Sequence, residues 1–78
     1  MSDLVIHNIN ISYDESDERV RNFVKYLKRP EQKEETRAYY LQVKNSPEQR
    51  IYIVDHYGNE FSFVYQNEHN CLIGLRGM

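Results

Sequence analysis

The sequence is poor in the features that define several functional classes. Its single cysteine, Cys71, cannot form an internal disulfide. Ten basic and twelve acidic residues give a net charge of -2, so the chain lacks the overall basic excess of a protein whose whole surface binds nucleic acid. A local basic face is still compatible with this charge. No apolar run approaches the roughly 18 residues of a membrane-spanning helix, and the N-terminus lacks the basic start and apolar stretch of a secretory signal. These absences predict a cytoplasmic protein that makes no membrane contact.

Catalytic and metal-binding patterns are also missing. His7, His56 and His69 are widely spaced and, with one cysteine, match no zinc motif, so we expect neither a metal nor another cofactor. Cys71 is interpreted as a small apolar strand residue, because a nucleophilic thiol needs a base beside it. The acidic run 14–18 fits helix capping better than paired carboxylates for acid–base chemistry. We therefore expect no complete catalytic site in this chain.

The length of the chain limits its organisation. With 78 residues there is room for one hydrophobic core, so residues 1–78 are predicted to form a single small domain. Domains of this size bury only about 60% of the surface that the unfolded chain exposes, and their stability is thin. A natural fragment of a larger protein, or an oligomer such as a homodimer, is compatible with this size.

The N-terminal half is predicted to contain one strand and one helix. Apolar residues alternate over 5–13, interrupted only by His7, as in a strand with one buried face. Asp14 or Ser16 then supplies an N-cap, and Pro30 ends the helix. Apolar residues at i, i+3, i+4 and i+7 predict that this helix is amphipathic. Its apolar stripe consists of Val20, Phe23, Val24 and Leu27.

The C-terminal half is predicted to be an antiparallel meander of about four strands. After a charged, solvated loop over 31–35, strands are expected at 38–43, 50–56, 61–65 and 71–75, with polar turns at 45–48 and 66–70. Gly58 and Asn59 suit a two-residue hairpin turn, which requires positive φ. The predicted fold class is therefore α+β: an N-terminal strand, one amphipathic helix and the meander.

Seven tyrosines and three phenylalanines allow two interpretations. Tyrosine stacks on nucleic-acid bases, and with basic neighbours it could form a face for RNA or for a protein partner. The residues of this predicted face are Arg37, Tyr40, Lys44 and Arg50. The alternative, which we favour, is that the aromatic residues reflect strand propensity and core filling.

Two segments resemble the N-terminal part of ribosome-inactivating proteins, the rRNA N-glycosidases of the ricin A-chain type. The segment 22–28, Asn-Phe-Val-Lys-Tyr-Leu-Lys, looks like the first-helix pattern of that family. The segment 61–77 contains Phe-Ser-Phe-Val-Tyr, a polar turn and Asn-Cys-Leu-Ile-Gly-Leu-Arg-Gly, which resemble the family's strand, turn and following strand. The resemblance spans roughly residues 5–77 and includes the order strand, helix, meander.

The resemblance implies an N-terminal piece or a truncated relative that contributes one wall of an adenine pocket. Asn70, Cys71 and Gly74 are the implied substrate-binding positions. The family places an adenine-stacking tyrosine where this chain has Cys71 or a near neighbour, and a thiol offers no π-face to a base. Leu75 also replaces an aromatic residue, and the family's catalytic glutamate and arginine would lie beyond residue 78. The implied protein is inactive alone and needs a complementary chain.

Two other functions are compatible with the sequence. The chain can be a stand-alone protein-interaction module, such as a phage or mobile-element inhibitor that docks its sheet edge or its acidic helix start onto a host enzyme. It can also be a small RNA-binding protein that uses the aromatic and basic face, although its negative net charge opposes this. Neither function requires a catalytic set.

Overall fold

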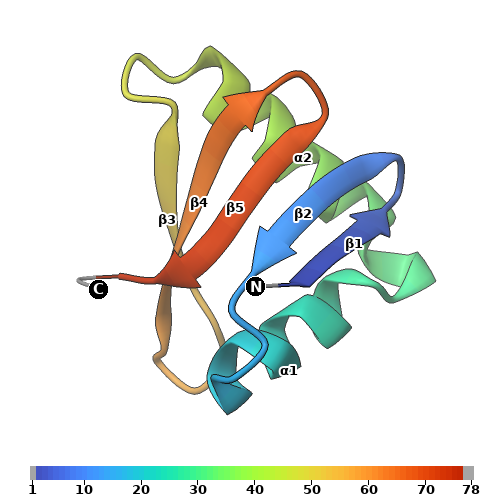
Figure 1. Ribbon diagram of the computed structural model, residues 1–78, viewed down its shortest axis with the longest axis vertical. Coiled ribbons are helices and arrows are strands. Elements are labelled where there is room, and N and C mark those ends of the chain that lie inside the picture. Colours follow the sequence, from blue (N-terminus) through green and yellow to red (C-terminus); the bar gives the residue numbers. More distant parts are fainter. Residues whose placement is uncertain (1, 77–78) are drawn as a thin grey trace.

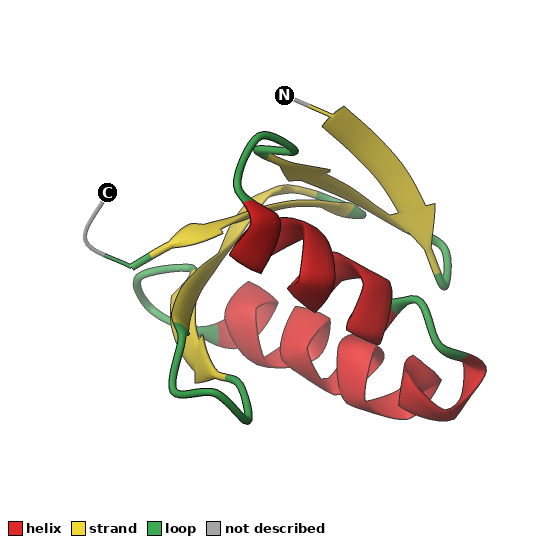
Figure 2. Cartoon of the chain, turned by 90° about the horizontal axis from the view of Figure 1, so that it is seen from below, coloured by secondary structure: helices red, strands yellow, loops and turns green. Residues whose placement is uncertain are grey.

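In the computed structural model, which describes residues 2–76, the chain forms a five-stranded mixed sheet with two α-helices packed on one face (Figures 1 and 2). The predicted α+β class is confirmed. No helix within residues 2–76 is both long and apolar enough to cross a membrane. In chain order the elements are β1 (Ser2–Ile6), β2 (Ile9–Tyr13), α1 (Glu18–Leu27), a 3₁₀ turn (Pro30–Gln32), α2 (Lys33–Asn45), β3 (Arg50–Val54), β4 (Glu60–Asn67) and β5 (Asn70–Leu75).

The prediction of one strand over 5–13 is wrong, because a turn divides this segment into β1 and β2. His7 and Asn8 have φ angles of 50° and 72°, the left-handed conformation that a tight two-residue hairpin requires. Ile6 and Ile9 pair across the turn, and both are buried. Val5, which the single strand would have placed with the buried residues, is instead 67% exposed.

The helix α1 has the predicted apolar stripe but a different start. Asp17 is the N-cap, and its carboxylate accepts the backbone N–H groups of Arg19 at 2.8 Å and Val20 at 3.4 Å. Asp14, one of the two predicted caps, instead accepts hydrogen bonds from the other, Ser16, in the turn before the helix. The helix ends before Pro30, as predicted. Its buried residues are Val20, Phe23, Val24 and Leu27.

The 3₁₀ turn and the start of the second helix, α2, together replace the predicted loop over 31–35, and α2 replaces the predicted strand over 38–43. Its buried residues, Thr36, Tyr40 and Val43, follow the spacing of four and three that defines a helix face. Leu41, which the strand pattern had grouped with Val43, is 55% exposed. The short alternation of apolar residues was therefore a misleading strand signal, and the fold has two helices instead of one.

The predicted meander exists with three strands instead of four: β3, β4 and β5 are antiparallel neighbours. Gly58 and Asn59 do lie in the β3–β4 connection, but that connection spans 55–59 and only Gly58 has positive φ, 82°. The predicted two-residue turn at this place is therefore wrong. The connection from β4 to β5 is tighter and contains His69 at φ 63°.

The sheet is mixed because β2 lies parallel to β5. The strand order is β1-β2-β5-β4-β3, and Ile11 is paired with Cys71 in the parallel ladder. A parallel pair needs a long connection, which here contains both helices and the strands β3 and β4. The N-terminal hairpin thus extends the meander into one continuous sheet, a pairing that the sequence analysis had left unspecified.

The core lies between the two helices and the sheet, which curves around them (Figure 2). Phe61 and Phe63 of β4 are fully buried, and the Phe23 ring of α1 stacks on Phe61 with ring centroids 4.3 Å apart. Burying a side chain of this size contributes about 1.5–3 kcal/mol. On the other face of the sheet, Tyr52 and Val54 of β3 are 47% and 61% exposed.

Candidate binding pocket

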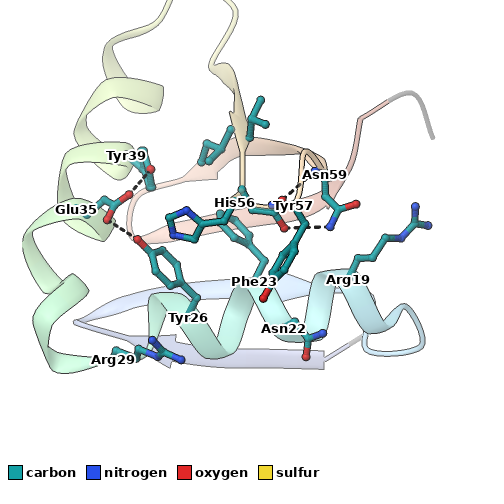
Figure 3. A pocket seen from close by; sticks show the side chains of 13 residues that line it. Arg19, Asn22, Phe23, Tyr26, Arg29, Glu35, Tyr39, His56, Tyr57 and Asn59 are labelled. Atoms are coloured by element: carbon teal, nitrogen blue, oxygen red, sulfur yellow. Dashed lines mark hydrogen bonds between the residues drawn. The ribbon is translucent and has the colours of Figure 1, made fainter.

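A pocket with a volume of about 380 Å³ lies where α1, the start of α2 and the end of β3 meet (Figure 3). We call it the tyrosine pocket, because Tyr26 and Tyr39 form its wall on the α2 side. The loop 55–59 forms the opposite wall. The residues that line it are Arg19, Asn22, Phe23, Tyr26, Arg29, Glu35, Tyr39, Ile53, Val54, Asp55, His56, Tyr57 and Asn59.

The α1 side of the pocket follows from helical spacing. Arg19, Asn22, Phe23 and Tyr26 occur at i, i+3, i+4 and i+7, so one flank of α1 presents all four. Phe23 is 5% exposed and is fixed by its stack on Phe61. The floor of the pocket is therefore part of the hydrophobic core, while the rim carries amide and guanidinium groups.

Glu35 is held in the pocket by two tyrosines. The Tyr26 hydroxyl donates to Oε2 at 3.0 Å, and the Tyr39 hydroxyl donates to Oε1 at 2.5 Å (Figure 3). Desolvation raises the pKa of both phenols, and the nearby Glu35 carboxylate raises each pKa further. Both phenols are therefore neutral donors at neutral pH, and the carboxylate has a fixed position.

The negative charge of Glu35 has no partner in an ion pair within residues 2–76. The three ion pairs there are Arg19–Asp17, His69–Glu68 and Arg76–Glu60. Arg29 also lines the pocket, and its guanidinium carbon lies 6.0 Å from the centroid of the Tyr26 ring. The half-buried carboxylate consequently favours a cation that enters the pocket from outside.

The loop 55–59 is organised by the side chain of Asp55. Its Oδ1 accepts the backbone N–H of Tyr57 at 2.9 Å and of Asn59 at 2.8 Å, and its Oδ2 accepts the Asn59 amide at 3.1 Å. Desolvation acts to raise the pKa of Asp55, but these hydrogen bonds outweigh it, so the net pKa is lowered. The fixed loop places His56 edge-on to Tyr26, with ring centroids 6.1 Å apart, and leaves Tyr57 88% exposed.

The pocket offers groups that can bind a cation. Aromatic faces and a carboxylate are the groups that recognise ammonium and guanidinium ions. Neither serine nor cysteine lines the pocket, and both oxygens of Glu35 already accept hydrogen bonds from neutral phenols. Residues 2–76 also contain no group of three or more His, Cys, Asp or Glu side chains arranged to hold a metal ion.

The residues of the predicted aromatic and basic face are only partly brought together. Arg37, Tyr40 and Lys44 share α2, and the Lys44 ammonium lies 5.9 Å from the centroid of the Tyr40 ring. Tyr40, however, is 7% exposed, and its ring stacks on His69. Arg50 begins β3 and lines a separate hollow with Val64 and Leu72. The four residues therefore do not form one continuous face.

The three positions implied by the glycosidase resemblance all lie on β5, but Cys71 is on the buried face of the strand whereas Asn70 and Gly74 are on the other face. Asn70 holds the β4–β5 turn, where its side chain bonds to Asn10, Asn67 and the backbone of Glu68. Cys71 is fully buried on the helix side of β5, and burial raises the pKa of its thiol to about 11. Gly74 lies across from Ser62, whose hydroxyl would be 3.6 Å from an added Cβ.

Sequence reasoning missed the residues of the tyrosine pocket. Glu35 had been assigned to a solvated loop, and Tyr26 had been noted only as part of the segment 22–28. One available signal was the i, i+4 spacing of Glu35 and Tyr39, which makes two side chains neighbours once the segment is helical. The contribution of the loop 55–59 had no sequence signal, because it arises from the packing of distant elements.

Comparison with known proteins adds no assignment to this geometry. No protein-family model, no curated protein and no solved structure matches the chain.

Proposed function

We propose that this chain is a non-catalytic protein-interaction module that receives an arginine or lysine side chain of a partner protein in the tyrosine pocket. The observation that carries the proposal is the half-buried Glu35 carboxylate, which two tyrosine hydroxyls hold in place and which no cation within residues 2–76 contacts in an ion pair. Because this carboxylate has no ion-pair partner, the expected ligand is a cation.

The size and lining of the pocket suit a guanidinium group. A planar guanidinium can stack on the ring of Tyr26 while it donates to Glu35, and its aliphatic stem can lie against Phe23. The charge of Arg19 on the rim is offset by its ion pair with Asp17 at 3.0 Å. Arg29 already lies over Tyr26, so an incoming cation displaces it toward solvent.

A cationic ligand distinguishes this function from the two nucleic-acid functions. A phosphate group that entered the pocket would meet the Glu35 carboxylate, and the net charge of -2 adds a weak repulsion. The glycosidase fragment and the RNA-binding protein stay predictions from the sequence. Arg19 and Arg29 also line the pocket, but Arg19 is paired with Asp17, and the Glu35 carboxylate opposes a phosphate group there.

The test uses a blocked Gly-Arg-Gly peptide and its citrulline analogue, which has the same shape without the charge. We expect the arginine peptide to shift the NMR signals of Tyr26, Tyr39 and His56, and the citrulline peptide to bind about tenfold more weakly or not at all. Glu35→Gln should weaken the arginine peptide by about five- to tenfold. Glu34→Gln, an equal charge change on the exposed neighbour in α2, is the matched control.

Equal binding of the two peptides would contradict the proposal, and so would equal effects of Glu34→Gln and Glu35→Gln. A single-stranded RNA oligonucleotide serves as the competing ligand, measured by fluorescence anisotropy at several salt concentrations. Salt-dependent binding that the arginine peptide displaces would assign the pocket to nucleic acid instead.

A further inference from the structure

The strand β3 forms an open edge of the sheet. It is the last strand in the order β1-β2-β5-β4-β3 and pairs only with β4 (Figure 1). The Gln49 carbonyl accepts from Tyr65 at 2.9 Å, and the Asp55 N–H donates to Asn59 at 3.0 Å, so the odd-numbered residues bond toward β4. In an antiparallel ladder the intervening residues Arg50, Tyr52 and Val54 therefore direct their N–H and C=O groups away from β4.

The edge carries few of the devices that prevent strand pairing. Proteins commonly protect edges with lysine, proline, a bulge or a covering segment. The sequence of β3, Arg-Ile-Tyr-Ile-Val, has no proline and one charged residue, at its first position. Tyr52 and Val54 leave 47% and 61% of their surfaces exposed. The edge thus offers apolar side chains together with free backbone donors and acceptors.

The edge leads directly into the tyrosine pocket. Ile53 and Val54, the last two residues of β3, line the pocket, and the loop that follows them forms one wall (Figure 3). A strand added beside β3 would lie about 4.8 Å from it and would direct alternate side chains to the helix face of the sheet. One of those side chains, opposite the end of β3, would reach the mouth of the pocket.

We propose that the partner binds as an extended segment that adds a sixth strand at β3 and places its basic side chain in the tyrosine pocket. This inference rests on the proposed function, because the unpaired charge of Glu35 calls for a basic side chain on the helix face of the added strand. A second copy of this edge does not supply one, since its only basic residue, Arg50, shares the exposed face of β3 with Tyr52 and Val54. In this binding mode backbone hydrogen bonds supply affinity and the pocket supplies specificity. The other edge strand, β1, contributes no residue to the pocket.

The experiment uses blocked seven-residue peptides of alternating threonine and valine, with one arginine moved through the positions. Arginine at the productive position should give the tightest binding and should shift the amide signals of Arg50, Tyr52 and Val54. Two further versions of that peptide carry N-methyl groups on alternate residues, one set on each side of the extended backbone. Only the peptide whose N-methyl groups face β3 should bind more weakly than the unmodified peptide. We expect a loss of about tenfold in affinity, because two hydrogen bonds are removed.

A variant of the protein gives an independent measurement. Tyr52→Pro removes an outward N–H and no bond to β4, so the fold should persist while peptide affinity falls about three- to tenfold. Val5→Pro on β1 is the matched control and should leave affinity unchanged; circular dichroism verifies that both variants fold.

The outcomes separate the two proposals. If both methylated sets bind equally while Glu35→Gln still weakens binding, strand addition is wrong and the pocket proposal stands. If the sets differ but citrulline and Glu35→Gln have no effect, the pocket proposal is wrong. If no peptide of the panel perturbs the β3 amides, the inference is overturned.

Discussion

At the scale of single residues, one carboxylate determines where α1 begins. Asp17 accepts the N–H groups of Arg19 and Val20, which have no partner inside the helix because they belong to its first turn. The hydrogen bond from the Arg19 side chain is the largest cause that lowers the pKa of Asp17 below its usual value of 3.8. The ionised carboxylate is therefore more favourable in the folded state than in the unfolded state.

A pair of substitutions separates the charge of Asp17 from its capping role. Because the folded pKa is lowered, the ionised group stabilises the fold above pH 3.8, and this contribution disappears as the pH falls through the folded pKa. We expect Asp17→Asn to unfold at a lower urea concentration than the parent at pH 7, and the difference to vanish at a pH below the folded pKa of Asp17.

Asp17→Ala should lose stability at both pH values, because alanine cannot accept the two N–H groups. Urea denaturation followed by circular dichroism measures both variants. Identical curves for the alanine variant and the parent would show that the cap contributes nothing.

Residues with positive φ also explain why element boundaries were hard to predict. His7, Asn8, Gln49 and His69 adopt this conformation although none is glycine. Asparagine and histidine adopt it more readily than most residues but do not require it, and glutamine gives no such signal. The hairpin at His7 and Asn8 was therefore hidden inside an apparently continuous strand.

At the scale of elements, a buried threonine joins the two helices. The Thr36 hydroxyl lies 3.2 Å from the carbonyl oxygen of Leu27, at the end of α1, and 3.0 Å from that of Gln32. Thr36 is fully buried, so no water replaces this donor when it is removed. The hydroxyl thereby holds the end of one helix against the first turns of the next.

Thr36→Val keeps the shape of the side chain and removes the donor. We expect it to lower the free energy of unfolding by about 1–2 kcal/mol, because the buried Leu27 carbonyl loses a partner. Thr36→Ser and Thr36→Ala both lack the methyl group, and the serine variant should be the more stable because it keeps the hydroxyl. Chemical denaturation of the three variants tests the order, and an alanine variant as stable as the serine variant would contradict it.

The helix α2 shows how a polar residue conceals a pattern. Thr36, Tyr39, Tyr40 and Val43 have the same i, i+3, i+4, i+7 spacing as the apolar stripe of α1, and all four are buried or half-buried. A polar threonine and β-favouring tyrosines obscured this periodicity. Packing of this face against the sheet outweighed the local strand propensity.

At the scale of the whole molecule, the reactivity of the Cys71 thiol is a measure of global unfolding. It lies in β5, between β2 and β4, and is fully buried. Burial raises the pKa of the thiol to about 11, so little of it is thiolate near neutral pH. A thiol reagent can therefore react with Cys71 only in molecules in which the sheet has opened.

We expect Ellman's reagent to modify Cys71 at pH 8 only in the fraction of molecules that is unfolded. The rate should rise with urea in proportion to the unfolded population and should equal that of a free thiol once the chain is denatured. Rapid labelling in native buffer would show that β5 opens locally, contrary to its central position.

The sequence by itself determined the α+β class, the apolar face of α1, its end before Pro30 and the last three strands of the predicted meander, although not the number of strands. These features depend on short-range periodicity and on residues such as proline that act locally. The predictions failed where a turn residue had only a weak signature, as at His7, or where a helix face included a polar residue, as at Thr36.

Only the tertiary structure decided the parallel pairing of β2 with β5 and the formation of the tyrosine pocket. Ile11 and Cys71 are paired although sixty positions separate them in the numbering, and no local pattern encodes such a partner. Tyr26, Glu35 and His56 likewise come from three different elements that meet only when both helices pack on the sheet. Local propensities act over a few residues, whereas these contacts depend on which distant apolar faces exclude water together.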